Sequence, residues 1–231
     1  KYDYETTQEY HFKVVVTDRY SEDRADVTVS LENKPEGPIL PDPPPAMAVD
    51  ENSKKGTRVD VIVADDDDCK GSYKATCAMP VYSLIASEVA AKDYKAFTID
   101  KDGTIRVAAD NSLNYEVKNE YYLRVVAKDG EESDLADTVE LTILINDVND
   151  KPWFEDEPYK LAVHETAKKN TFVGSVVAGD EDSWTELKYE LEDYESGSKD
   201  ASVFKIDNDG KITLATSSLN YEKKKQYLFW V

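Results

Sequence analysis

Residues 97–103 read FTIDKDG, and residues 204–210 repeat this motif as FKIDNDG. Each run is followed by Leu-Asn-Tyr-Glu, at 113–116 and at 219–222. Tyr2-Asp3-Tyr4-Glu5 has the place of this second motif in a partial copy at the start of the chain. In all three copies a Tyr follows the Glu by five residues. A repeat of just over one hundred residues predicts a tandem array of similar domains.

The segments between these motifs alternate apolar with polar residues, a pattern typical of β-strands that bury one face on a second sheet. The alternating rows are 10–16, 121–127 and 139–145. Asp102-Gly103 and Asp209-Gly210, each set between short apolar runs, predict hairpin turns. The best helical candidate, 87–97, is short and fits a loop or a single turn equally well. We therefore expect an all-β protein made of β-sandwich domains.

Prolines mark the expected boundaries between the repeats. Six prolines lie between Pro35 and Pro45, too many for the interior of a sheet, and Pro152 follows a predicted strand. We expect the C-terminal part of a repeat at 1–36, a complete repeat at 37–152, and a third repeat at 153–231. Because 227–231 align with 121–125, we expect the third repeat to lack its last strand here and the parent chain to extend beyond the segment.

The chain is strongly acidic, with 48 Asp and Glu against 28 Lys and Arg and a formal charge of -20. Such a charge disfavours binding to nucleic acid or to an anionic membrane surface and favours cations as partners. A solubilising coat of charge is the simpler alternative. No apolar run approaches the roughly 20 residues of a membrane span, and the N-terminus does not resemble a signal peptide.

The acidic residues lie at the ends of predicted strands. Asp129 continues the apolar row 121–127, and an unpaired carboxylate there would be costly to bury. Asp18 ends the equivalent row of the first copy. Pairs of aspartates follow two other strands, and Asp147-Val148-Asn149-Asp150 closes the complete repeat. Calcium, which takes six to eight oxygen ligands, would suit such clusters.

These residues also resemble a known family. The ordered motifs Val-x-Glu-Asn, Ala-x-Asp-x-Asp, Leu-(Asp/Asn)-x-Glu, Ala-x-Asp-Gly and Asp-x-Asn-Asp before Pro are similar to those of the extracellular cadherin repeat. The resemblance spans essentially the whole chain. It implies tandem Greek-key immunoglobulin-like β-sandwich repeats, one complete and two partial, with calcium ions at each junction between repeats.

The resemblance also implies the calcium ligands. For the first junction they are Asp3, Glu5, Glu32, Asn33, Asp66, Asp68 and Asp129. For the second they are Glu51, Glu116, Asn149, Asp150, Asp180 and Asp182, with the backbone oxygens of Val148 and Lys151. It implies up to about three ions per junction, with fewer or weaker ions at the first, where the closing motif has changed to Leu31-Glu32-Asn33. Asn114 and Asn220 stand where the family often has Asp, which removes one negative charge from each site.

The two cysteines, Cys69 and Cys77, lie close together in a loop with no His nearby. This spacing favours a local disulfide over a metal site, and a disulfide favours an oxidising compartment. The sequence has no Asn-x-Ser/Thr site, so it gives no support for N-glycosylation.

The sequence disfavours an enzyme, since neither His11 nor His164 lies in a catalytic or metal-hydrolase spacing. No small-molecule substrate is expected. The resemblance implies calcium-dependent cell–cell adhesion or recognition through another cadherin ectodomain, homophilic or heterophilic. It places the chain on the extracellular side of the plasma membrane, in a larger membrane-anchored protein. A non-adhesive spacer, a mechanical tether and the ectodomain of a cadherin-like receptor are alternatives.

Overall fold

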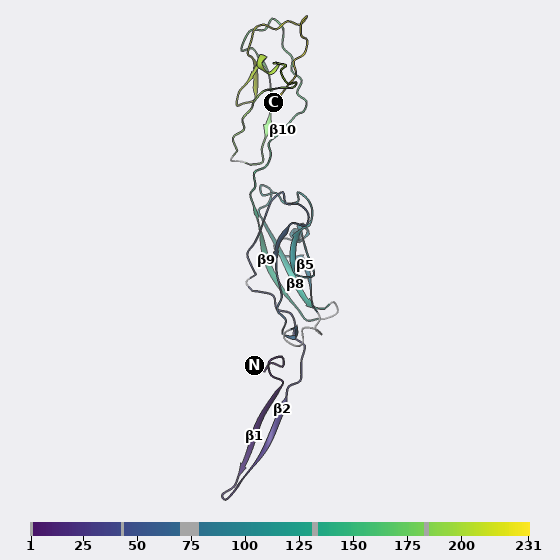
Figure 1. The fold of residues 1–231 in the computed structure, drawn as a ribbon, viewed down its shortest axis with the longest axis vertical. Helices are drawn as coiled ribbons and strands as arrows, with labels where there is room; N and C mark the ends of the chain where they lie inside the picture. The colour runs from purple at the N-terminus through teal and green to yellow at the C-terminus, as the bar shows by residue number, and fades with distance from the viewer. Residues whose placement is uncertain (1, 43, 70–78, 131–133, 183–184) are drawn as a thin grey trace. The chain divides into compact units, whose positions relative to one another are not determined.

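The computed structural model describes residues 2–42, 44–69, 79–130, 134–182 and 185–231. The chain divides into two compact units, Lys1–Val148 and Asn149–Val231. Each unit consists of β-strands joined by loops and short 3-10 turns (Figure 1). The all-β fold predicted from the alternating rows is confirmed. The predicted repeat boundaries after residues 36 and 152 stay predictions.

The first unit begins with an antiparallel hairpin of β1 (Glu9–Thr17) and β2 (Glu22–Ser30), labelled in Figure 1. The hairpin forms a sheet of two strands. Its apolar row is exposed, to 49% at Phe12, 49% at Val14 and 66% at Val16. No second sheet covers this row among the described residues, which include only the expected C-terminal part of its repeat, so the burial of the row stays a prediction. Strand alternation creates an apolar face but does not by itself supply the layer that covers it.

The rest of the first unit is a two-sheet sandwich. Its larger sheet has the order β3-β9-β8-β5, in which β3 runs parallel to β9 and the other neighbours are antiparallel. These strands are β3 (Met47–Asp50), β5 (Pro80–Ala86), β8 (Glu120–Asp129) and β9 (Ala136–Asn146). The second sheet has the order β4-β7-β6. Its strands are β4 (Arg58–Val61), β6 (Phe97–Ile99) and β7 (Thr104–Val107).

The core of this sandwich draws on both sheets. Leu123 and Val125 of β8 are fully buried together with Ile105 of β7. The predicted inward row 121–127 is buried at every second residue, which confirms the alternation. Two short 3-10 turns, η1 (Asp67–Cys69) and η3 (Asp93–Ala96), complete the described elements of this unit. The helical candidate 87–97 thus forms a single short turn.

The two predicted Asp-Gly turns connect antiparallel strands in both units. Gly103 has a φ of +80°, and a Cβ at this position would lie 1.9 Å from the carbonyl oxygen of Ile62. Gly210 has a φ of +71°, and its Cβ would lie 2.2 Å from the carbonyl oxygen of Val176. Only glycine meets both the conformational and the steric requirement. The predicted hairpins are confirmed.

The described residues of the second unit form shorter strands in three small sheets. Its elements are β10 (Trp153–Phe154), β11 (Phe172–Ser175), β12 (Ala178–Gly179), β13 (Glu192–Asp193), η4 (Ala201–Val203), β14 (Phe204–Ile206), β15 (Lys211–Leu214) and β16 (Phe229–Trp230). Its buried core consists of Val176, Phe204, Ile212 and Leu214. Partly buried aromatic residues, among them Tyr227, pack around this core.

Candidate metal centre

Asp66 is the most buried carboxylate of the first predicted site. It follows β4 and is only 5% exposed. Its Oδ1 accepts a hydrogen bond of 3.1 Å from the backbone N–H of Asp68. Its Oδ2 is buried and has no hydrogen-bond partner among the described residues. Burial raises the pKa of the Asp66 carboxyl, and the negative charge of Asp129 raises it further.

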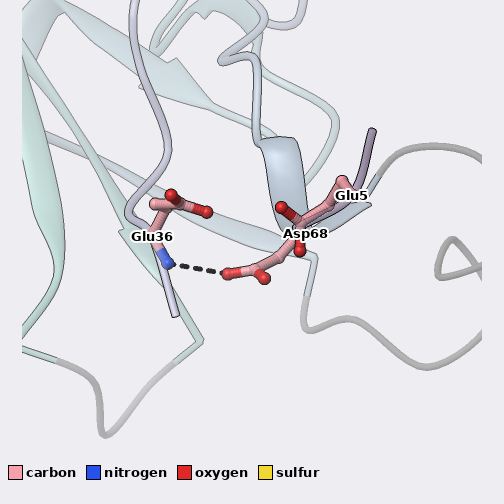
Figure 2. Close-up of side chains that lie close together, drawn as sticks. All are labelled: Glu5, Glu36 and Asp68. Carbon is pink, nitrogen blue, oxygen red and sulfur yellow. Dashed lines mark hydrogen bonds between the residues drawn. The ribbon is translucent and has the colours of Figure 1, made fainter. Parts of the chain in front are cut away.

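Glu5, Glu36 and Asp68 bring carboxylate oxygens within 4.8 Å of one another. Figure 2 shows these three side chains and the hydrogen bond, 2.7 Å long, that the backbone N–H of Glu36 donates to Asp68. The side-chain amide of Asn33 donates a second bond to Asp68, at 3.3 Å. One oxygen of Glu5 is buried with no hydrogen-bond partner among the described residues. The structure therefore brings together Glu5, Asn33 and Asp68 of the predicted set.

Two other members of the first set are placed differently. The carboxylate of Asp3 accepts hydrogen bonds from the backbone N–H and the hydroxyl of Thr6, at 2.9 and 3.0 Å, and so closes its own turn. Glu32 is exposed and is not in the carboxylate group, in which Glu36 lies instead. Glu36 was not among the ligands predicted from the sequence. The available signal was a carboxylate directly after Asn33-Lys34-Pro35, the changed closing motif.

Glu51 connects two loops at one end of the complete sandwich. It is 2% exposed, and its Oε2 accepts the backbone N–H of Tyr115 at 2.8 Å. Its Oε1 accepts the backbone N–H of Val148 at 2.9 Å. Oxygens of Glu51, Glu116 and Asp147 all lie within 4.8 Å of one another. Asp147 was not among the predicted ligands, although it opens the closing motif Asp147-Val148-Asn149-Asp150.

The second unit carries its own group of aspartates. Asp180 Oδ1 accepts the backbone N–H of Asp182 at 2.9 Å, the same arrangement as Asp66 with Asp68. Asp182 is 2% exposed and accepts the backbone N–H of Asp150 at 2.7 Å. Asp180 Oδ2 is buried without a hydrogen-bond partner among the described residues. Asn149 bonds the carbonyl of Asp150 at 2.6 Å, and Lys151 is exposed.

The predicted second site would combine Glu51 and Glu116 of the first unit with Asp180 and Asp182 of the second. This combination stays a prediction, as does the contribution of backbone oxygens from Val148 and Lys151.

The disulfide predicted between Cys69 and Cys77 also stays a prediction. Cys69 is disulfide-bonded in the structure. Cys77 lies outside the described residues.

The donor sets suit a hard divalent cation. Buried carboxylate oxygens such as Asp66 Oδ2 and Asp180 Oδ2 carry a desolvation cost that no described hydrogen bond offsets. The surrounding groups are carboxylates and an Asn side chain, which offer the oxygen ligands that calcium takes. No Cys or His belongs to these groups among the described residues, which disfavours zinc.

Comparison with known proteins agrees with this architecture. The family model described as "Cadherin domain" matches residues 45–146. Cadherin-20 of Gallus gallus is 35% identical over 201 residues, covering 82% of this chain and 23% of the relative. Cadherin-18 of Homo sapiens is 32% identical over 197 residues, covering 82% of this chain and 24% of the relative. The chain thus spans about a quarter of the length of these curated relatives.

A solved structure extends the likeness to the fold. Mouse cadherin-23 EC22-24 is 29% identical, with a TM-score of 0.55, and the match covers 93% of this chain and 66% of that one. Fold and motifs together define a protein of immunoglobulin-like β-sandwich repeats with acidic strand ends. The chain belongs to the cadherin superfamily. Cadherins are adhesion proteins rather than enzymes, in agreement with the expectation from sequence. No helix among the described residues is long and apolar enough to cross a membrane.

Proposed function

We propose that this chain is part of a cadherin ectodomain that mediates calcium-dependent cell–cell adhesion or recognition. The observation that carries this proposal is the pair of buried carboxylate oxygens without a described hydrogen-bond partner, Asp66 Oδ2 and Asp180 Oδ2. They occupy the same position in the two units, each beside an aspartate whose backbone N–H bonds the other oxygen. A repeated, costly arrangement of this kind supports a cation as the missing partner.

Two sets of residues would hold the ions. The first consists of Asp3, Glu5, Glu32, Asn33, Asp66, Asp68 and Asp129, to which we add Glu36. The second consists of Glu51, Glu116, Asn149, Asp150, Asp180 and Asp182 with backbone oxygens of Val148 and Lys151, to which we add Asp147. We propose up to about three ions for each set, with fewer at the first.

Charge repulsion gives these residues a mechanical role. Calcium, when bound, supplies the positive charge that such carboxylates need in order to lie close together. Without it, Glu51 and Glu116 would repel Asp182 across the linker at Pro152, so that the linker would stay flexible. We propose that Asp182 bridges the two units through its ions and so makes the junction rigid. A rigid ectodomain presents a distant binding face in a defined orientation.

The proposed partner is another cadherin ectodomain, either the same protein or a different family member. The proposed place is the extracellular side of the plasma membrane, in a larger membrane-anchored protein. Family membership supports both proposals.

Bead aggregation tests adhesion, and a junction variant tests its mechanism. Beads coated with the ectodomain should aggregate at about 1 mM calcium and disperse in chelator. Asp182→Ala should reduce aggregation and the calcium-induced rise of melting temperature. Asp209→Ala, which removes an exposed carboxylate of the same unit from outside the predicted set, is the control. Dispersed beads in calcium, with themselves and with plausible partner cells, would instead favour a spacer or tether. Wild-type behaviour of Asp182→Ala would refute its bridging role.

A further inference from the structure

The loop 113–118, here called the Glu116 loop, carries its carboxylate on an exposed turn. Glu51 holds the loop from one side by accepting the backbone N–H of Tyr115 at 2.8 Å. Within the loop, the side chain of Asn114 accepts the backbone N–H of Val117 at 2.7 Å. The backbone carbonyl of Asn114 accepts the N–H of Lys118 at 2.9 Å. These bonds shape the turn. The bond to Glu51 ties it to another part of the sandwich, as does the bond of 3.1 Å that the carbonyl of Leu113 accepts from the N–H of Asn52.

A second anchor lies at the other end of the loop. Asp93, at the start of η3, is 9% exposed, and both its oxygens accept from Lys118 Nζ, at 2.6 and 2.7 Å. Asp93 Oδ2 also accepts the backbone N–H of Tyr122 at 2.9 Å. The ammonium group of Lys118 lies 5.0 Å from the centre of the Tyr121 ring. Asp93 thus ties the end of the Glu116 loop to the start of β8.

The second unit repeats this arrangement with different neighbours. Lys224 Nζ bonds Asp200, whose other oxygen accepts the backbone N–H of Leu228 at 2.9 Å. Lys224 lies 5.2 Å from the centre of the Tyr227 ring. The carboxylate of Glu165 accepts the N–H of Tyr221 at 2.8 Å, as Glu51 does with Tyr115. Two occurrences in one chain make a chance contact a poor explanation.

We infer that Asp93 is a positioning residue for calcium binding, because its ion pair with Lys118 fixes the loop that presents Glu116. This inference rests on the proposed function, since it assigns Glu116 as a ligand. A loop held at both ends loses little conformational freedom when its carboxylate takes up an ion. Residues that orient metal ligands typically contribute about 10- to 100-fold to metal affinity.

Calcium titration calorimetry on the 231-residue chain tests the inference. Asp93→Asn keeps the side-chain volume and an acceptor for Tyr122 but removes the charge that holds Lys118. Lys118→Met removes the other half of the pair. We expect each change to weaken the tightest calcium binding about tenfold, and the double variant to be no weaker than the weaker single one. If simple charge governed the affinity, Lys118→Met would instead tighten binding, and this result would overturn the inference.

A matched variant separates positioning from general loss of stability. Asp200→Asn breaks the equivalent ion pair in the second unit, whose loop carries no ligand of the two proposed sets. In chelator both Asn variants should lower the melting temperature by similar amounts, whereas only Asp93→Asn should weaken calcium binding. Lys118→Arg, which keeps the charge, should retain most of the affinity. Equal calcium affinity of Asp93→Asn and wild type refutes the inference, and so does equal weakening by Asp200→Asn. A wild-type chain that takes up no calcium refutes the proposed function itself.

Discussion

The hairpins β1–β2 and β8–β9 have the same sequence pattern and opposite environments. In the first, Val14 pairs with Ala25 and is 49% exposed. In the second, Val125 pairs with Val139 and is fully buried. The difference is a covering sheet: Ile105 and Val107 of the second sheet pack in the same core as β8 and β9, whereas no second sheet lies over β1 and β2 among the described residues. Alternation therefore determines which face of a strand is apolar, whereas burial requires a covering layer.

The carboxylates that end the two apolar rows, Asp18 and Asp129, also differ in their environment. Asp18 accepts the backbone N–H groups of Tyr20 and Ser21, at 2.8 and 2.7 Å, and so closes the exposed β1–β2 turn. Asp129, at the end of β8, instead adds its charge to the buried site of Asp66. Equivalent places in two copies of a motif thus serve a turn in one copy and a candidate metal centre in the other.

The largest expected effect comes from the same substitution at equivalent positions of the two hairpins. Val125→Ala should lower the free energy of unfolding by about 2 kcal/mol, because it removes fully buried apolar surface and leaves a cavity. Val14→Ala should change it by less than about 0.5 kcal/mol, because half of the side chain is already exposed. Denaturant unfolding of both variants measures the difference. Equal losses would show that the apolar face of β1–β2 is covered in solution.

A smaller effect, which changes sign with calcium, is expected from Asp66→Asn. In chelator the variant should be more stable than wild type, because it removes a buried charge that Asp129 repels. At about 1 mM calcium it should forgo about 1.4 kcal/mol of linkage stabilisation, expected for one lost site with a dissociation constant near 0.1 mM, and this loss should outweigh the gain and make the variant less stable than wild type. Thermal unfolding in the two buffers measures both signs.

Asp18→Asn is the matched control for this test, since it changes the carboxylate that ends the other row. Its effect on stability should be the same in calcium and in chelator. A calcium-dependent effect of Asp18→Asn, or an effect of Asp66→Asn with one sign in both buffers, would remove the distinction between the two carboxylates.

The smallest expected effect concerns the pH dependence of stability, for which Asp18 and Asp66 are compared. Hydrogen bonds from Tyr20 and Ser21 lower the pKa of Asp18, whereas burial raises the pKa of Asp66. Ionised Asp18 therefore stabilises its turn above the ordinary carboxyl pKa, and this stabilisation is lost as the pH falls through the lowered pKa. The contribution of Asp66 to stability depends on pH in the opposite direction. Its carboxyl ionises as the pH rises, and the buried negative charge then destabilises the folded protein. In an NMR titration without calcium, Asp18 should titrate at a lower pH than Asp66, and the reverse order would contradict both assignments.

Much of the candidate metal centre followed from motif spacing, because Asp66-x-Asp68 and Asp180-x-Asp182 are local arrangements that the chain forms by itself. Glu36 and Asp147 were missed as ligand candidates because their roles depend on where the closing segments lie against Glu5, Asp68, Glu51 and Glu116. The Asp93–Lys118 pair was missed for the same reason, since it joins residues 25 apart in the sequence. Such pairings depend on how loops fold back on the sandwich.

The sequence by itself determined the repeat, the strands, the Asp-Gly turns and the family, because these depend on local periodicity and on motifs in a fixed order. Only the tertiary structure decided which apolar rows are buried, which carboxylates share a site and which carboxylate closes a turn instead. These outcomes depend on contacts between distant segments and on local desolvation. For Val14 and Val125, or for Asp18 and Asp129, the same local pattern is compatible with either outcome.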